Sequence, residues 1–313
     1  MKIIFFGGIR KTDTKDLNLN DITGTPALYS YFLRKEFNKL GIETTYCEAK
    51  ARNATDDEVN SIHIPKGDHI LAVFQRAFSI RCRKTNKLEK NIRRSISGKM
   101  TAICDHSLKN PTEDIIFYAV PTKKPPEKNI YLGWACDHSL LTPEKDSTRI
   151  RILIDHAYYG KNQPLDLTVS ISKQCLDFQK NYKEKQIIIR RFSGPSGCET
   201  INDNNWNNEV YDRSTSMPYP KACEEYKKAD IFIVTHPESL GLSVLESAAA
   251  GAYILCPKDY IKSNILKQIR HDQFNKTISL FDTISKIDIN QSIERTKNFT
   301  WQIISEKIIK ELK

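Results

Sequence analysis

The hydrophobic positions of the chain fall into short continuous runs that alternate with longer segments of mixed polarity. The runs are rich in isoleucine, leucine, valine and phenylalanine, and they lie at residues 3–6, 42–47, 70–74, 100–104, 115–120, 131–135, 150–154, 186–189, 231–234 and 253–255. Continuous runs of this kind are typical of strands that are buried on both faces of a parallel sheet.

The segments between these runs predict helices at residues 24–40, 165–182, 221–228 and 300–312. In the first of them, Pro26 stands near the first turn and Gly41 follows the last apolar position, which are start and stop signals of a helix. Strands that alternate with helices predict doubly wound α/β domains with parallel sheets.

The alternation runs through the chain twice, on either side of a polar, proline-containing stretch near residues 143–149. A length of 313 residues fits two domains of roughly 150 residues each. We therefore expect one domain at residues 1–146, a second at 147–298, and a last helix in 299–313.

Neither the apolar runs nor the cysteines indicate a secreted or membrane-spanning chain. The runs are far shorter than the roughly 20 residues that a transmembrane helix needs. The first one, residues 3–6, is too short for the core of a signal peptide. The chain has 8 cysteines and no C-x-x-C pair, so a zinc or redox motif is not indicated. We expect buried free thiols and a cytoplasmic location.

The formal net charge is +10, and the excess is concentrated between residues 76 and 99, where nine basic residues accompany one acidic residue, Glu89. Within this segment Leu88, Ile92 and Ile96 recur every four positions, which predicts a basic amphipathic helix. Such a helix suits an anionic membrane surface or a nucleic acid. The alternative is an ordinary solvated face in a lysine-rich protein.

Three Asp-His pairs follow apolar runs. The pentapeptide C-D-H-S-L occurs at residues 104–108 and again at 136–140, and Asp155-His156 is the third pair. In open α/β sheets the ligand crevice lies outside the carboxyl ends of the strands, so these pairs are candidates for acid–base or polar roles. Alternatively, they only cap the turns that follow the strands.

Residues 231–255 combine two strands with an apolar helix that carries a single carboxylate, Glu246; Glu238 lies eight residues earlier, in the loop before the helix. The unpaired N–H groups at the start of a helix, near Gly241, favour an anion such as a phosphate. Two carboxylates beside a phosphate can accept hydrogen bonds from neutral hydroxyls on either side of it. A nucleotide sugar has this layout, with ribose hydroxyls on one side of its diphosphate and sugar hydroxyls on the other. The alternative is that Glu246 points to solvent and Glu238 only complements the helix dipole.

Residues 229–255 read A-D-I-F-I-V-T-H-P-E-S-L-G-L-S-V-L-E-S-A-A-A-G-A-Y-I-L. This segment resembles the E-x7-E signature of the GT-B glycosyltransferases, specifically the large group 1 family of retaining nucleotide-sugar transferases. It departs from the family pattern at His236-Pro237, where the order Pro-Ser is usual, and at Tyr253, where proline is common. A weaker likeness extends over the first helix and second strand, over Y-L-G-W-A-C-D-H-S-L-L-T-P-E, and over E-R-T-K-N-F-T-W-Q-I-I-S-E-K near the C-terminus.

The resemblance implies two Rossmann-like domains that face a cleft, with the last helix packed back on the N-terminal domain. The C-terminal domain would hold the nucleotide-sugar donor, with Glu238 on the transferred sugar and Glu246 on the ribose; His106 of the N-terminal domain would line the sugar site. The donor-binding candidates are Glu246, Ser239, Leu240, Gly241, Leu242, Lys161, Arg190 and Arg191. Because the chain has no Asp-x-Asp motif, cationic side chains rather than a metal ion would neutralise the leaving diphosphate, and no cofactor is expected.

The resemblance also places the acceptor on the N-terminal domain, where the basic segment lies. The acceptor-binding candidates are Arg81, Arg83, Lys84, Arg93 and Arg94. One acceptor is a glycan or lipid-linked glycan at an anionic membrane, with the enzyme peripheral to it. Another is a hydroxymethylated base in DNA, the substrate of some phage glucosyltransferases of this fold. A third reading is a GT-B-like protein that binds a nucleotide or glycan without turnover.

Overall fold

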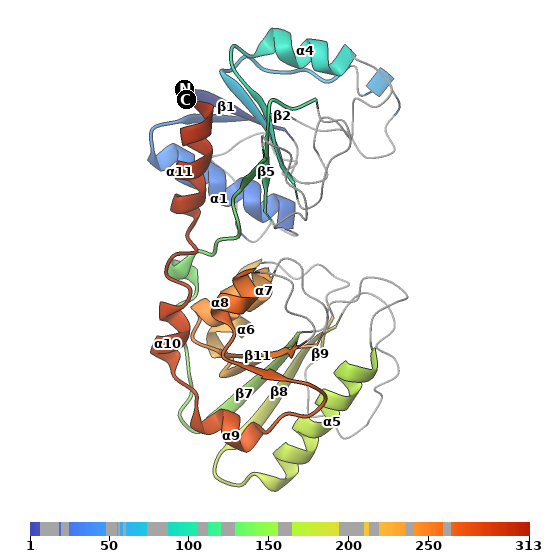
Figure 1. The fold of residues 1–313 in the computed structure, drawn as a ribbon, viewed down its shortest axis with the longest axis vertical. Helices are drawn as coiled ribbons and strands as arrows, with labels where there is room; N and C mark the ends of the chain where they lie inside the picture. The colour runs from blue at the N-terminus through green and yellow to red at the C-terminus, as the bar shows by residue number, and fades with distance from the viewer. Residues whose placement is uncertain are drawn as a thin grey trace. The chain divides into compact units, whose positions relative to one another are not determined.

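The computed structural model describes residues 1–6, 19, 25–47, 55, 57–58, 61–73, 87–104, 112–119, 129–155, 165–193, 210–212, 219–235, 241–258 and 264–313. The chain forms two compact units (Figure 1). Unit 1 comprises Met1–Trp134 together with Trp301–Lys313, and unit 2 comprises Ala135–Thr300.

Unit 1 is built on a six-stranded sheet in which all strands are parallel. In spatial order the strands are β2 (Glu43–Cys47), β1 (Lys2–Phe6), β3 (His69–Val73), β4 (Met100–Cys104), β5 (Ile115–Tyr118) and β6 (Asn129–Tyr131). The described helices of the unit are α1 (Thr25–Lys39), α4 (Lys87–Ser95) and α11 (Trp301–Leu312). Nearly all residues of β1 and β4 are buried, because both faces of the sheet are covered there.

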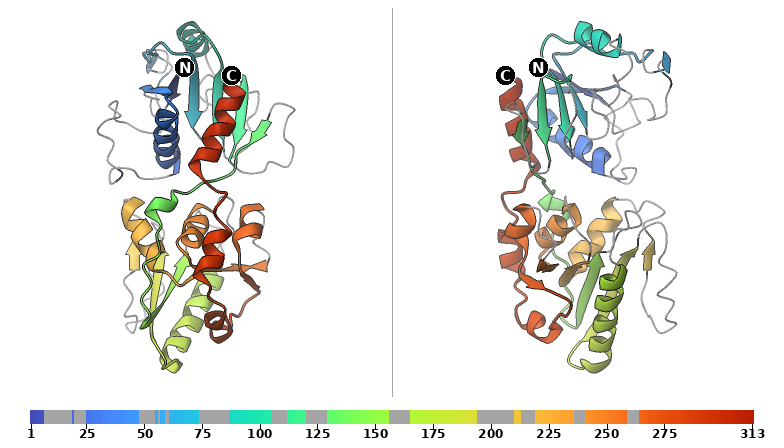
Figure 2. Two further views of the ribbon diagram at one scale, coloured as in Figure 1. Left: turned by 90° about the vertical axis from the view of Figure 1, so that its left-hand side faces the viewer. Right: turned by 45° about the vertical axis from the view of Figure 1, so that its right-hand side comes forward.

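The last helix, α11, packs on α1 although it is distant in sequence (Figures 1 and 2). The Trp301 ring stacks on Phe32 at a centroid distance of 5.1 Å. The Tyr29 ring meets Trp301 and Trp134 edge-on, at 4.7 and 5.4 Å, and its hydroxyl donates to the Gly133 carbonyl at 2.9 Å. The two points at which the chain leaves and re-enters unit 1 are therefore held by one aromatic cluster.

Unit 2 is built on a second six-stranded parallel sheet. In spatial order its strands are β12 (Asp272–Phe274), β11 (Tyr253–Pro257), β10 (Ile231–Val234), β7 (Arg149–Asp155), β8 (Gln186–Ser193) and β9 (Val210–Asp212). Counted within the unit, this is the order 3-2-1-4-5-6 of a Rossmann sheet. The described helices are α5 (Leu165–Asn181), α6 (Tyr219–Lys228), α7 (Leu242–Ala249), α8 (Asn264–Ile269), α9 (Leu280–Ser285) and α10 (Ile289–Glu294).

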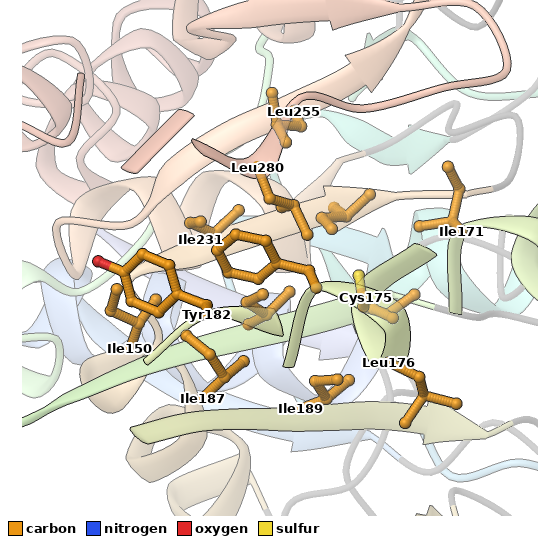
Figure 3. Packing of buried hydrophobic residues seen from close by; sticks show 14 of the residues in the cluster. Ile150, Ile171, Cys175, Leu176, Tyr182, Ile187, Ile189, Ile231, Leu255 and Leu280 are labelled. Atoms are coloured by element: carbon orange, nitrogen blue, oxygen red, sulfur yellow. The ribbon is translucent and has the colours of Figure 1, made fainter. Parts of the chain in front are cut away.

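One face of this sheet carries the main hydrophobic core of unit 2 (Figure 3). Alternate residues of the strands, such as Ile150, Ile152 and Ile231, meet Cys175 of α5 and Leu280 of α9. Helices α6 and α7 contact strands of the same sheet. The unit is thus a doubly wound α/β domain, and the expectation of two Rossmann-like domains with the C-terminal helix on the first of them is confirmed.

The observed elements differ from the sequence prediction at the edges of the sheets. Strand β6 ends at Tyr131, whereas the apolar run 131–135 predicted a strand there; most of that run instead leads toward unit 2. Strands β9 and β12, which have three residues each, were not predicted.

The chain passes from unit 1 to unit 2 between Trp134 and Ala135, earlier than the expected boundary after residue 146. The Cys136 N–H donates to the Phe299 carbonyl at 3.0 Å, and the Glu144 N–H donates to the Lys227 carbonyl at 2.9 Å. The bond of Glu144 attaches the polar stretch to unit 2, so this stretch does not serve as the linker.

Candidate functional site

The E-x7-E segment lies where the strand order of unit 2 reverses. From β7 the sheet grows in one direction through β8 and in the other through β10. Ligands of open α/β sheets bind beyond the carboxyl ends of the strands at such a switch point. Strand β10 ends at Val234, and α7 begins after Gly241. The loop between them, with Glu238, Ser239 and Leu240, lies outside the described residues.

Helix α7 starts without a side-chain cap. Gly241, which has no side chain, precedes it in the left-handed region (φ 68°, ψ 25°), so the N-cap position provides no side-chain cap. Leu242 opens the helix and is half-buried, while Ala248 and Ala249 are buried. Small residues let the helix lie close to β10 and β11, which it contacts. The N–H groups of the first turn therefore remain suited to an anion.

The Glu246 carboxylate is buried on α7, with 3% of the residue exposed, so the interpretation that it points to solvent is excluded. The Tyr219 hydroxyl donates to its Oε1 at 2.6 Å. Tyr219 is the first residue of α6, which packs against α7 (Figure 1). The site thus contains a carboxylate that a second helix holds in place.

Among the described residues, three neutral groups feel the charge of this carboxylate: Tyr219, Cys223 and Cys136. Burial and the charge of Glu246 raise the pKa of Tyr219 well above its usual value, so the phenol stays protonated and remains a donor. Burial and the same charge raise the pKa of Cys223 to about 12, and they raise that of Cys136 well above the usual thiol value. The Cys223 thiol lies one turn after Tyr219 on α6.

Among the cation candidates, the structure describes only the Arg190 side chain. Its Nε lies 3.8 Å from Oε2 of Glu225 on α6, and Nη1 of Arg151 lies 3.9 Å from the same oxygen. Arg190 pairs with Leu153 in the interior of β8, before the carboxyl end of the strand. This geometry is that of a structural ion pair. The side chains of Arg191 and Lys161 lie outside the described part.

In unit 1, the basic helix α4 reaches the end of the sheet where the strands begin. Arg93 donates to both oxygens of Asp114 at 3.2 Å and to Glu89 at 3.1 Å. Asp114 directly precedes β5, so Arg93 sits where the strands begin, away from the edge where such sheets bind ligands. Arg94 is exposed beside it. The structure does not describe Arg81, Arg83, Lys84 or His106.

One Asp-His pair can be assigned a structural role. Asp137 caps the short 3-10 helix η3 (His138–Leu140), accepting from the Ser139 N–H at 3.1 Å. The His138 Nε2 lies 3.2 Å from the Thr296 carbonyl and 3.6 Å from the Cys136 sulfur. This pair follows the turn-capping interpretation. The His106 pair and the His156 ring lie outside the described residues.

Tyr219 and Cys223 were not among the sequence candidates. The helix was predicted to begin at residue 221, and α6 begins two residues earlier. Pro220 in the first turn was the available signal, because proline is favoured at helix starts. The hydrogen bond from Tyr219 to Glu246 joins residues 27 positions apart. Because it depends on the tertiary packing of two helices, it could not be predicted from a local sequence pattern.

Among the residues that the structure describes, no group of three or more His, Cys, Asp and Glu side chains is placed to hold a metal ion. None of the helices described there is long and apolar enough to cross a bilayer.

No family model matches the chain, and no curated protein matches it in sequence. Solved structures do match it over its full length. HepE from Anabaena, in complex with UDP and glucose, matches with a TM-score of 0.58 at 9% identity. The match covers 100% of this chain and 99% of the HepE chain. Sucrose-phosphate synthase from Thermosynechococcus elongatus has a TM-score of 0.56 at 10% identity, with coverages of 99% and 98%.

A glycosyltransferase from Rickettsia africae ESF-5 has a TM-score of 0.56 at 10% identity and covers 99% of this chain and 97% of its own. The arrangement common to these proteins is the GT-B fold of two Rossmann-like domains. The chain therefore has the GT-B fold, as its E-x7-E segment led us to expect.

Proposed function

We propose that the chain is a retaining glycosyltransferase that moves a sugar from a nucleotide-diphosphate sugar to a hydroxyl of a glycan or lipid-linked acceptor. The observation that carries the proposal is the buried Glu246 carboxylate on α7, at the switch point of the C-terminal sheet of a GT-B fold. The presence of UDP and glucose in the Anabaena structure of the same fold supports a donor of this class.

In this proposal each part of the segment binds one part of the donor. The N–H groups at the start of α7, from Gly241 onward, hold the diphosphate. The Glu246 carboxylate accepts hydrogen bonds from the ribose hydroxyls. Glu238 contacts the transferred sugar on the other side of the diphosphate. This division puts each carboxylate on neutral hydroxyls and keeps both from direct contact with the phosphate charge.

The reaction needs positive charge where the diphosphate leaves. We assign this role to Lys161 and Arg191 in preference to Arg190, because Arg190 already lies beside Glu225. The proposed reaction is metal-independent. Retaining enzymes of the family that the sequence resembles use the leaving phosphate to help deprotonate the acceptor, so a protein nucleophile is not required.

We assign donor binding to the C-terminal domain and acceptor binding to the N-terminal domain. The basic segment of the N-terminal domain favours an anionic acceptor, because a cluster of positive charge raises the local concentration of anions. Since Leu88 and Ile92 of α4 are buried in the core of unit 1 and Arg93 lies where the strands begin, this helix would attract the anionic surface that carries the acceptor through its charges, without insertion into a membrane and without lining the reacting site.

The proposal is tested by donor binding followed by turnover. In a thermal-shift panel of UDP-, GDP- and CMP-sugars, one donor at 100 times its Kd should stabilise the protein by about 2.7 kcal/mol. Glu246→Ala should lose nucleotide affinity, because the ribose contact is removed. Glu238→Ala should lose turnover more than nucleotide binding, because its contact is with the sugar.

Glu224→Ala, which changes an exposed glutamate on α6, serves as the matched control and should behave like the wild type. Wild-type turnover by both Glu238→Ala and Glu246→Ala would overturn the assignment. Donor binding without release of nucleotide diphosphate with any acceptor would favour the non-catalytic reading. Transfer to hydroxymethylated DNA would favour the alternative acceptor.

A further inference from the structure

The Glu246 carboxylate is held by a second residue that lies 27 positions away in the sequence. The Tyr219 hydroxyl donates to Oε1 at 2.6 Å, and both residues are buried. A distance in this range is typical of a charge-assisted O–H···O⁻ bond, which is about twice as strong as a bond between neutral groups. A bond of this kind fixes the direction in which the carboxylate faces.

Tyr219 is itself placed rigidly. It is the first residue of α6, and Pro220 in the first turn restricts the backbone there. The tyrosine has a raised pKa, so it stays a hydrogen-bond donor throughout the neutral pH range. The carboxylate is therefore oriented before any ligand arrives.

We propose that Tyr219 is a positioning residue, whose hydroxyl orients the Glu246 carboxylate to accept hydrogen bonds from the ribose of the donor. This inference rests on the proposed function, in which Glu246 binds the ribose hydroxyls. A residue that holds a ligand-binding side chain in its bound orientation reduces the entropy that this side chain loses when the ligand binds. It also makes binding more selective for ligands with matching geometry. Tyr219 thus strengthens the discrimination between a ribonucleotide and one without ribose hydroxyls.

The measurement is the ratio of two dissociation constants, determined by calorimetry on the full chain. The probes are UDP, GDP and ADP, each compared with its 2′,3′-dideoxy form, and the pair that binds best is used. In Tyr219→Phe the affinity for the ribonucleotide should fall roughly tenfold, as expected for a lost hydrogen bond to a charged group. The affinity for the dideoxy form should stay unchanged, so the ratio falls by the same factor.

Tyr182→Phe is the matched control, because it also removes a tyrosine–glutamate hydrogen bond in unit 2, from Tyr182 to Glu184 at 3.0 Å, outside the site. It should keep the wild-type ratio. A Tyr219→Phe protein that is folded and keeps the wild-type ratio would overturn the inference.

A double-mutant cycle separates positioning from direct contact and also covers the case in which Tyr219→Phe does not fold alone. In the Glu246→Gln background, adding Tyr219→Phe should change neither dissociation constant, because Tyr219 acts only through Glu246. An equal loss in both backgrounds would show that Tyr219 touches the nucleotide itself, and the inference would fail.

The wild-type protein tests the premise separately. Without discrimination between the ribonucleotide and its dideoxy form in the wild type, the ribose role of Glu246 in the proposed function fails. If the wild type discriminates and Glu246→Gln abolishes the difference while folded Tyr219→Phe retains it, only the role of Tyr219 fails.

Discussion

Glu225 places one negative charge between two arginines that come from neighbouring strands. Its Oε2 lies 3.9 Å from Arg151 and 3.8 Å from Arg190, and the three side chains are 7%, 17% and 13% exposed. Removing the partner of a buried charge is strongly destabilising. We expect Glu225→Gln to lower the free energy of unfolding by about 3 kcal/mol, measured by urea denaturation.

The ion pair of Glu144 with Lys227, two residues after Glu225 on the same helix, provides the comparison. Glu144 is half exposed, and solvent-exposed pairs contribute less than about 1 kcal/mol. A comparable loss in Glu144→Gln and Glu225→Gln would contradict the view that burial sets the effect. The comparison also concerns the candidate site. A large loss of stability in Glu225→Gln would confirm that Arg190 serves a structural ion pair.

At the scale of elements, α4 has the basic amphipathic pattern that the sequence predicts, but its apolar stripe is not a binding face. Leu88 and Ile92 are completely buried in the core of unit 1, and Ile96 packs against the same cluster. Leu88→Ala should therefore lower the free energy of unfolding by about 3 kcal/mol, measured by urea denaturation. Arg94→Ala, on the exposed side, should change it by less than about 0.5 kcal/mol.

Both substitutions lie on one short helix, so the pair compares its two faces in the same background. A Leu88→Ala protein as stable as Arg94→Ala would contradict the packing of α4 on the sheet. In that case the apolar side of the helix would be available as a binding surface, as the sequence pattern alone allowed.

The central strands could be predicted from sequence, whereas the two edge strands of unit 2 could not. Strands β4 and β10 have the predicted bounds because both of their faces are buried, which imposes continuous apolar runs. Strands β9 and β12 form the two edges of their sheet and read V-Y-D and D-Q-F. An edge strand buries less apolar surface than a central strand. The sequences of these two short edge strands therefore resemble those of loops.

The site was predictable where its residues are close in sequence. The E-x7-E segment made Glu246 and Gly241 candidates, and the structure places Gly241 directly before α7 and Glu246 buried on it; their roles stay predictions. The partners of buried charges could not be derived in this way. Whether Arg190 meets a phosphate or Glu225 depends on which helix covers β8, and the contact from Tyr219 depends on how α6 packs against α7.

At the scale of the whole molecule, unit 1 is assembled from two distant parts of the chain. Its sheet and α1 come from the first 134 residues, and α11 comes from the last 13, Trp301–Lys313. The buried side of α11 includes Trp301, Ile304, Ile308 and Leu312. Unit 1 therefore lacks part of its apolar cover until the end of the chain has docked, whereas unit 2 is continuous in sequence.

Deleting residues 301–313 should consequently destabilise unit 1 and leave unit 2 nearly unchanged. The deletion removes the stacking of Trp301 on Phe32 and its edge contact with Tyr29, which exposes the face of α1 that α11 covers. Hydrogen exchange in α1 should accelerate at least tenfold, because each 1.4 kcal/mol of lost local stability gives a factor of about ten. Exchange in α5 of unit 2 should keep its wild-type rate. A chain lacking only the exposed Lys313 is the control, and equal acceleration in α1 and α5 would refute the independence of the two units.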